Sequence, residues 1–250
     1  MSQRSSQRSL STFGITPLGP SYDTPGFFGW NVDDAVYAYE AVAPNFARRV
    51  GSWDGSAPIR VAIPVDPHTD DAIPEMKAAV RRAADAMTRS GHVVIEQRSP
   101  ISFADLARIQ RATMLYEAGH ALKSLLDHPA GMVGEKLSEA IRQGLAMTAT
   151  QYLDERGQID AMRTAFLSVF AETDVFLWPA APGTAAEGLG WTGDPKYISP
   201  WTALGGPIVT LPAGKAANGL PLGCILSAKP GADWPMINWA CRLAAAAELH

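Results

Sequence analysis

Apolar positions recur along this 250-residue chain with two periods, which predict where helices and strands lie. Apolar residues at helical spacing, with charged residues on the other faces, predict amphipathic helices. Short apolar runs bounded by Pro, Gly or Asp predict buried strands. The helices are expected at 31–43, 69–90, 102–126, 134–147, 148–172 and 233–247, and the strands at 59–65, 92–96, 174–178, 208–212 and 222–227.

One group of these elements predicts a local topology. The strand at 59–65, the helix at 69–90 and the strand at 92–96 follow one another in under forty residues, with Gly91 between helix and strand. This order is typical of a βαβ unit, whose product is a parallel strand pair with the helix on one face. The wholly apolar strand at 174–178 is expected to be central in the sheet.

Composition adds only broad limits. The chain is 47% hydrophobic and 18% charged, and no apolar run reaches the roughly 18 residues of a membrane span. The net charge of -4 comes without a basic stripe, so neither membrane nor direct nucleic-acid binding is expected. Cys224 and Cys241 are interpreted as buried inert thiols, which favours a reducing, cytoplasmic setting. The Ser- and Arg-rich start predicts that residues 1–13 are a disordered tail or truncated remnant, and that 14–250 form one α/β domain.

Familiar catalytic and metal-binding patterns are missing from the sequence. No two of the five histidines have metal-ligand spacing, and there is no Gly-x-Ser-x-Gly elbow, phosphate-binding loop or dinucleotide fingerprint. The acidic pairs at 33–34 and 70–71 fall at predicted helix starts, where capping and the helix dipole explain them. We therefore expect no metal and no organic cofactor.

The most specific stretch is the loop before the first helix. Gly14, Ser21, Asp23 and Gly26 alternate there with prolines. Glycine gives unusual backbone angles, proline fixes φ, and Ser or Asp bonds nearby backbone, so the pattern indicates a rigid irregular loop. Read alone, it fits an ordinary surface loop that enters a helix.

The order of several segments resembles the amidase signature family. The loop FGITPLGPSYDTPGFFGWNVDDA resembles that family's Gly-x-x-Pro-x-x-x-Ser-x-Asp-x-x-Gly segment, and IRVAIPV, TATQYLDERGQIDAMR and DVFLWPAAP are similar to later segments in the same order. The last match is TALGGPIVTLPAGKAANGLPLGCIL. The resemblance implies an α/β fold, namely a mixed twisted sheet with helices on both faces, like the C-terminal part of the amidase fold.

The resemblance also implies an activity that this sequence cannot complete. Family members hydrolyse linear amides with a serine nucleophile, a neutral lysine base acting through a second serine, and backbone amides as oxyanion hole. Their Gly-Gly-Ser-Ser-Gly-Gly-Ser run and the preceding lysine are absent here, and Ser5 and Ser6 lack the neighbouring glycines. No residue is therefore assigned as catalytic. We expect the chain alone to be inactive, because losing nucleophile or base costs on the order of 10⁶ in kcat.

The remaining candidates are substrate-binding and supporting residues. By resemblance, Asp194, Trp201, Gly205, Gly206 and Pro207 would line the substrate pocket. The alternatives, a loop turn and a core aromatic, stay open. In the first loop, the expectation is that Gly14, Ser21, Asp23 and Gly26 support the active-site loop.

Two readings of the whole chain follow. The favoured one is the C-terminal part of an amidase, with a small-molecule amide substrate and either a homo-oligomer or a complementing N-terminal half as partner. The alternative is a non-catalytic amidase-like module that binds a partner protein. The fragment is favoured because a sheet without its N-terminal strands exposes edges and apolar surface that must be covered.

Overall fold

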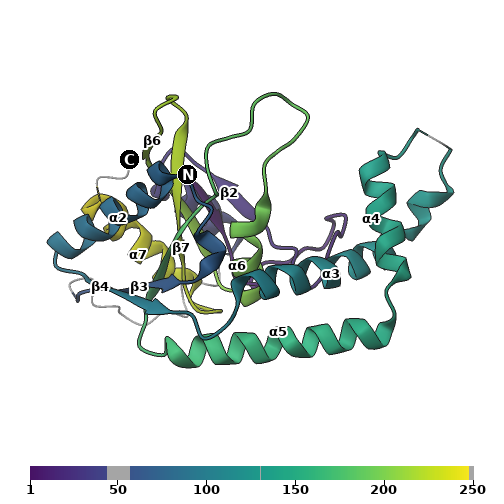
Figure 1. Ribbon diagram of the computed structural model, residues 1–250, viewed down its shortest axis with the longest axis horizontal. Helices are drawn as coiled ribbons and strands as arrows, with labels where there is room; N and C mark the ends of the chain where they lie inside the picture. The colour runs from purple at the N-terminus through teal and green to yellow at the C-terminus, as the bar shows by residue number, and fades with distance from the viewer. Residues whose placement is uncertain (44–56, 130, 248–250) are drawn as a thin grey trace.

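The computed structural model describes residues 1–43, 57–129 and 131–247, which build one seven-stranded sheet with helices on both faces (Figure 1). The strand order is β2-β1-β6-β7-β5-β3-β4. The strands are β1 (Ser2–Arg4), β2 (Gly26–Phe28), β3 (Arg60–Val65), β4 (Val93–Arg98), β5 (Val175–Pro179), β6 (Ile208–Lys215) and β7 (Pro221–Ser227). The helices are α1 (Val32–Val42), α2 (Pro74–Arg89), α3 (Phe103–Ala121), α4 (Glu135–Ala146), α5 (Ala149–Val169), α6 (Ser199–Leu204) and α7 (Asp233–Ala246).

The predicted parallel unit is present. β3 pairs in parallel with β4, with Val61 opposite Val94, and also with β5, where Val61 lies opposite Val175. All five residues of β5 are buried between β3 and β7, because an uninterrupted apolar run can lie only where both sheet faces are covered. The other pairings are antiparallel, so the expected mixed sheet is confirmed.

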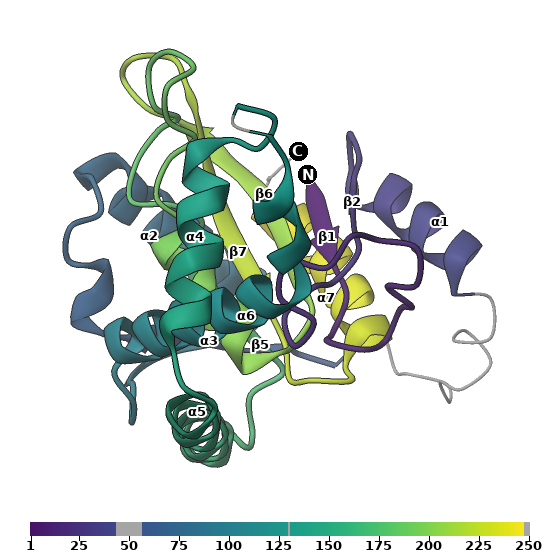
Figure 2. The same ribbon diagram turned by 90° about the vertical axis from the view of Figure 1, so that its right-hand side faces the viewer.

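The two crossovers explain the layers. β3 connects through α2 to β4, and β4 returns past β3 to β5 by way of α3, α4 and α5. Right-handed crossovers in opposite directions place their helices on opposite faces. α2 and α7 accordingly share one face, while α3, α5 and α6 pack together on the other, and α3 and α5 extend side by side toward α4 (Figures 1 and 2).

The start of the chain differs from expectation. Residues 1–13 were expected to be a disordered tail or a truncated remnant. Ser2–Arg4 forms β1 in the sheet between β2 and β6, which disagrees with a disordered tail, while the truncated remnant stays a prediction. The next residues are tied to the C-terminal helix, since the Ser6 amide donates to Asp233 Oδ1 at 2.6 Å and Gly231 N donates to Ser6 Oγ at 3.0 Å. A polar strand gives no hydrophobic signal, because backbone pairing and a buried carboxylate, rather than apolar burial, hold it in place.

Two helix boundaries also differ. The helix expected from 69 begins at Pro74, because Asp66 caps a separate 3₁₀ turn at Pro67–Thr69. The long helix expected to 126 ends as α3 at Ala121, and a 3₁₀ turn follows at Lys123–Asp127.

The cysteines are both free. Cys224 is fully buried, as expected, and burial raises the pKa of its thiol to about 12. Cys241 is only partly buried.

Gly206 shows how tightly the end of α6 packs against the sheet. A Cβ at this position would lie 1.9 Å from the Ala228 carbonyl oxygen. We predict that Gly206→Ala lowers the free energy of unfolding by at least about 2 kcal/mol, because rigid backbone must move. The control is Gly157→Ala in α5, which meets no atom within 4 Å and should be neutral or stabilising by about 0.5–1 kcal/mol. Equal unfolding free energies for the two variants in urea titrations would contradict this packing.

Candidate substrate cleft

A cleft of about 590 Å³ joins two segments that are far apart in the sequence. One wall is the irregular loop before α1, the floor is α3, and the other wall is the segment that leads into α6. The charged and polar lining residues include Tyr22, Asp23, Arg108, Arg111, Asp194 and Thr202. The structure therefore brings the predicted Asp23 and Asp194 to one cleft.

The loop wall is held by hydrogen bonds to its own backbone. Asp23 Oδ2 accepts from Leu18 N at 2.9 Å and from Gly19 N at 3.1 Å. A carboxylate that is already committed to backbone amides fixes a loop rather than transferring protons. Asp23 thus shapes this wall, while its part in an active site stays a prediction.

Glu117 of α3 connects the loop to the helices. Its carboxylate, on a residue only 9% exposed, accepts from Ser21 N at 2.8 Å through Oε2 and from the Tyr152 hydroxyl at 2.7 Å through Oε1. The Tyr22 hydroxyl lies 2.5 Å from Thr113 Oγ1 and accepts from Arg156 Nη1 at 3.2 Å. Burial, followed by the bond to Glu117, raises the pKa of Tyr152, so its phenol stays a neutral donor.

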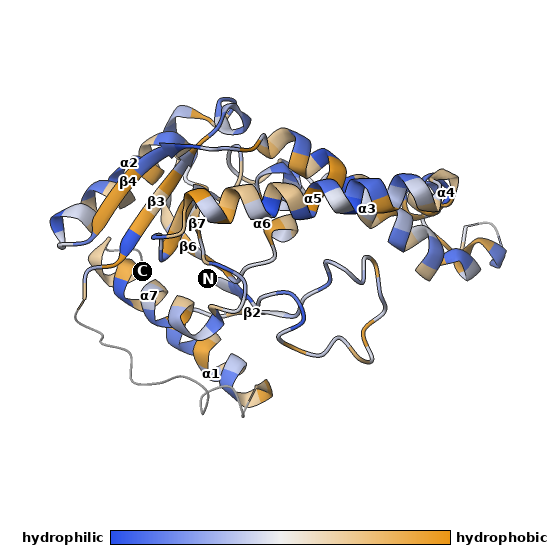
Figure 3. Cartoon of the chain, turned by 90° about the horizontal axis from the view of Figure 1, so that it is seen from below, coloured by the Kyte–Doolittle hydropathy of each residue, from blue (hydrophilic) through white to orange (hydrophobic). Residues whose placement is uncertain are grey.

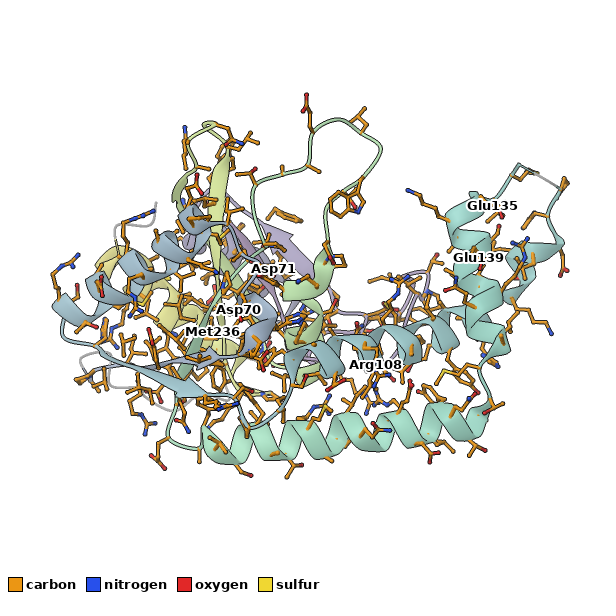
Figure 4. All side chains as sticks on the ribbon, viewed as in Figure 1. Asp70, Asp71, Arg108, Glu135, Glu139 and Met236 are labelled. Atoms are coloured by element: carbon orange, nitrogen blue, oxygen red, sulfur yellow. The ribbon has the colours of Figure 1, made fainter. Side chains whose placement is uncertain are left out.

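The opposite wall is fixed at the 3₁₀ turn Pro195–Tyr197. Asp194 caps the turn by accepting from Lys196 N at 2.9 Å. Asp71 holds the same turn from below, since it binds Lys196 Nζ at 2.5 Å and the Tyr197 hydroxyl at 2.7 Å. Both bonds lower the pKa of Asp71, and the bond to Lys196 has the larger effect. Figure 4 shows Asp71 beside Asp70 and away from Arg108 on α3.

Four predicted pocket residues lie behind this wall. Trp201 is 1% exposed and packs among core rings, with centroids 5.4 Å from Phe176 and 5.7 Å from Trp178. Gly205 has φ +81° and ends α6, which requires the left-handed region that glycine tolerates. Pro207 carries a carbonyl that accepts from Ser227 Oγ at 3.0 Å. In this structure they support the wall, and contact with substrate stays a prediction for Trp201 and for residues 205–207.

Three predicted loop residues, Gly14, Ser21 and Gly26, are outside the cleft lining, and Ser21 contributes through its bond to Glu117. Gly14 is exposed with φ +86°, so its conformation favours glycine without any close neighbour. Gly26 lies in β2, where a Cβ would meet the Gln3 carbonyl oxygen at 2.8 Å. Glycine is therefore needed at position 26 because β1 and β2 pack closely there.

The sequence interpretation missed the contribution of α3. Arg108 and Arg111 line the cleft and Glu117 holds its wall, yet in the sequence they are charged residues on a helix with no distinguishing spacing. Arg142 is outside the cleft lining and pairs on α4 with Glu135 at 3.4 Å and Glu139 at 3.9 Å. Figure 4 shows both glutamates on α4, at the far end from Asp71.

A larger hollow of about 650 Å³ lies at the carboxyl ends of β3 and β4, and Lys196 lines both this hollow and the cleft. Of its three acidic lining residues, Asp66 accepts from His68 N at 2.8 Å and from Phe103 N at 3.3 Å. We place the candidate site in the smaller cleft because only that one includes both predicted segments. Over the described ranges, no three His, Cys, Asp or Glu residues could together hold a metal, and no helix is long and apolar enough to span a bilayer.

The Glu117 bonds generate a stability prediction. Glu117→Ala leaves the half-buried Ser21 amide and Tyr152 hydroxyl without their acceptor, so we expect a loss of about 1–3 kcal/mol and faster hydrogen exchange at Ser21. Glu139→Ala on exposed α4 is the matched control and should change stability by under about 0.5 kcal/mol. Unchanged exchange at Ser21 in the Glu117 variant would show that this bond does not hold the loop.

Comparison with known proteins gives a consistent result. The chain is 27% identical over 256 residues to 2-amino-5-chloromuconic acid deaminase of Comamonas testosteroni, covering 91% of this chain and 52% of that protein. It is 24% identical to an amidase of Pseudomonas putida, covering 84% and 50%. The chain thus spans about half the length of the curated relatives it matches.

Solved structures share the fold. A crystal structure of an amidase superimposes with a TM-score of 0.85 at 24% identity, covering all of this chain and 58% of the other. The structure of 6-aminohexanoate cyclic dimer hydrolase gives 0.74 at 16% identity, covering 98% and 60%. The Amidase family model matches residues 3–236, so this chain belongs to the amidase family.

Proposed function

We propose that this chain forms the substrate-side part of an amidase that hydrolyses linear carbon–nitrogen amide bonds. The observation that carries the proposal is the cleft that Asp23, Asp194 and α3 line together, in a chain of the amidase family. The substrate would be a small-molecule amide.

Among the residues that the structure describes, we assign none to the nucleophile, the base or the oxyanion donors of this reaction. Amide hydrolysis by a serine enzyme requires a nucleophile activated by a base, and donors for the oxyanion. Ser199 lines the cleft, but its hydroxyl donates to the Pro195 carbonyl at 3.0 Å. Lys196 also lines the cleft, but its Nζ is engaged by Asp71 Oδ2 at 2.5 Å. We infer that a segment carrying the serine nucleophile and lysine base completes the site.

The cleft itself would recognise and orient the substrate. Asp194, at the exposed rim, is suited to a substrate amino group, and Arg108 and Arg111 from the floor are suited to a carboxylate or carbonyl. Trp201 and residues 205–207 would fix the shape of the acyl side from behind. The rigid loop of Asp23 would limit how far a bound amide can turn, which is how positioning contributes to rate.

A second candidate function is a non-catalytic module that binds a partner protein. The observation that favours it is the set of large apolar side chains left at the surface, with Trp30 95% exposed. The amidase candidate would have a homo-oligomer or a complementing N-terminal half as its partner, and the module would bind a partner protein. The free cysteines support placing this partnership in a reducing, cytoplasmic setting.

Activity of the chain alone tests the proposal. We expect the 250-residue protein to release no 4-nitroaniline from 4-nitroacetanilide above the buffer rate, because nucleophile and base are missing. Ser199→Ala and Lys196→Ala are the controls, because Ser199 is the cleft residue that could replace the nucleophile and Lys196 is the one that could replace the base. Turnover in the unaltered protein that either variant abolishes would overturn the proposal.

A further inference from the structure

Helix α3 carries three buried polar side chains, Gln110, Thr113 and Glu117, and they differ in what they bind. The Thr113 hydroxyl lies 2.5 Å from that of Tyr22, and Glu117 holds the first loop and α5. Gln110 lies three residues before Thr113 and lines the cleft floor. Its backbone carbonyl accepts from Thr113 Oγ1 at 3.1 Å, but its side-chain carboxamide bonds to no residue that the structure describes.

The carboxamide of Gln110 opens to the cleft. The residue is only 5% exposed, and it is one of the residues that line the cleft. Its Nε2 and Oε1 are not sealed from solvent, unlike the unpaired Nε1 of Trp201 behind the wall. Hydrophobic and hydrophilic residues alternate along α3 in Figure 3, as expected for a helix with one side on the core and another on the cleft.

The other uncharged polar side chains of the cleft lining are already engaged. Thr202 Oγ1 accepts from Arg4 Nη1 at 2.7 Å and donates to the Ile198 carbonyl at 3.1 Å. The hydroxyls of Tyr22 and Ser199 have the partners given above. Within the described ranges, Gln110 is therefore the lining residue that keeps both a donor and an acceptor for a ligand.

The shape of a carboxamide selects one kind of amide. Gln110 presents an N–H donor beside a C=O acceptor, and a primary amide presents the same two groups on one edge, so the two can form a pair of hydrogen bonds. A secondary amide in the usual trans form has its N–H and C=O on opposite sides and can make only one of these bonds. Because a nearly buried carboxamide without partners costs free energy, a ligand that supplies both groups recovers it.

We propose that Gln110 recognises the substrate amide and that the substrate class is a primary carboxamide. In the overall reaction the carbonyl carbon gains the water oxygen, the C–N bond breaks, and the nitrogen leaves as ammonia, so the products are a carboxylate and ammonium. Gln110 binds and orients the amide and takes no part in bond breaking. The inference rests on the proposed function, because an amide must occupy the cleft.

Two ligands that differ by one methyl group test this role. NMR titrations of the 250-residue protein with benzamide and with N-methylbenzamide give the two dissociation constants. We expect benzamide to bind about fivefold tighter or more, as for the loss of one hydrogen bond.

A matched pair of variants separates recognition from structure. Gln110→Met keeps the length of the side chain and removes its donor and acceptor. We expect it to remove the preference for benzamide while Tm stays the same or rises, because no protein partner is lost. The control is Gln143→Met on exposed α4, where Gln143 Nε2 donates to Glu139 Oε1 at 3.0 Å, and it should keep the preference.

Each outcome decides the inference. No preference in the unaltered protein, or the same preference in Gln110→Met, would overturn the role of Gln110 while the amide cleft of the proposed function stood. A fall in Tm of more than about 5 °C in Gln110→Met would also overturn it, because the carboxamide would then have a structural partner. Binding of neither ligand would overturn both proposals. Conversion of benzamide to benzoate by the chain alone would contradict the missing nucleophile and base, and the ligand preference would still decide the role of Gln110.

Discussion

The carboxylate of Glu117 is the interaction on which the cleft depends. It is nearly buried, and both of its oxygens are engaged, one by the Ser21 amide and one by the Tyr152 hydroxyl. One side chain of α3 thus fixes the first loop against α5. A buried carboxylate with both oxygens hydrogen-bonded holds its partners in one arrangement. Removing it leaves those partners without an acceptor in a region that water reaches poorly. The loop can therefore form a rigid wall although it has no regular secondary structure.

The sheet provides the second constraint, because it joins the two ends of the chain. β1 lies between β2 and β6, and Ser6 is tied to Asp233 at the start of α7. Arg4 reaches α6, where Nη1 donates to Thr202 Oγ1 at 2.7 Å, and burial lowers the pKa of Arg4 to about 10. The early loop and the late wall of the cleft are consequently positioned by neighbouring strands of one sheet.

Whether the sequence predicts one of these features depends on the interaction that holds the feature in place. Apolar burial leaves a periodic pattern, so β5, the β3–α2–β4 unit and the helices α4, α5 and α7 were predictable. β1 was not, because backbone pairing and Asp233 hold a polar segment that looks like a tail. The loop and the segment at 194–207 were recognisable from glycine and proline placement, which reports backbone geometry. Their meeting over α3, and the roles of Arg108 and Glu117, required three-dimensional contacts that no local spacing encodes.

The central claim is that two distant segments form one preorganised cleft that takes an amide without hydrolysing it. The most direct measurement is an NMR titration of the 250-residue protein with benzamide, following backbone amide shifts and the ligand itself. The account predicts shifts at both residues 22–23 and 194–202, with benzamide intact throughout. Shifts confined to other regions, or conversion of benzamide to benzoate, would contradict it.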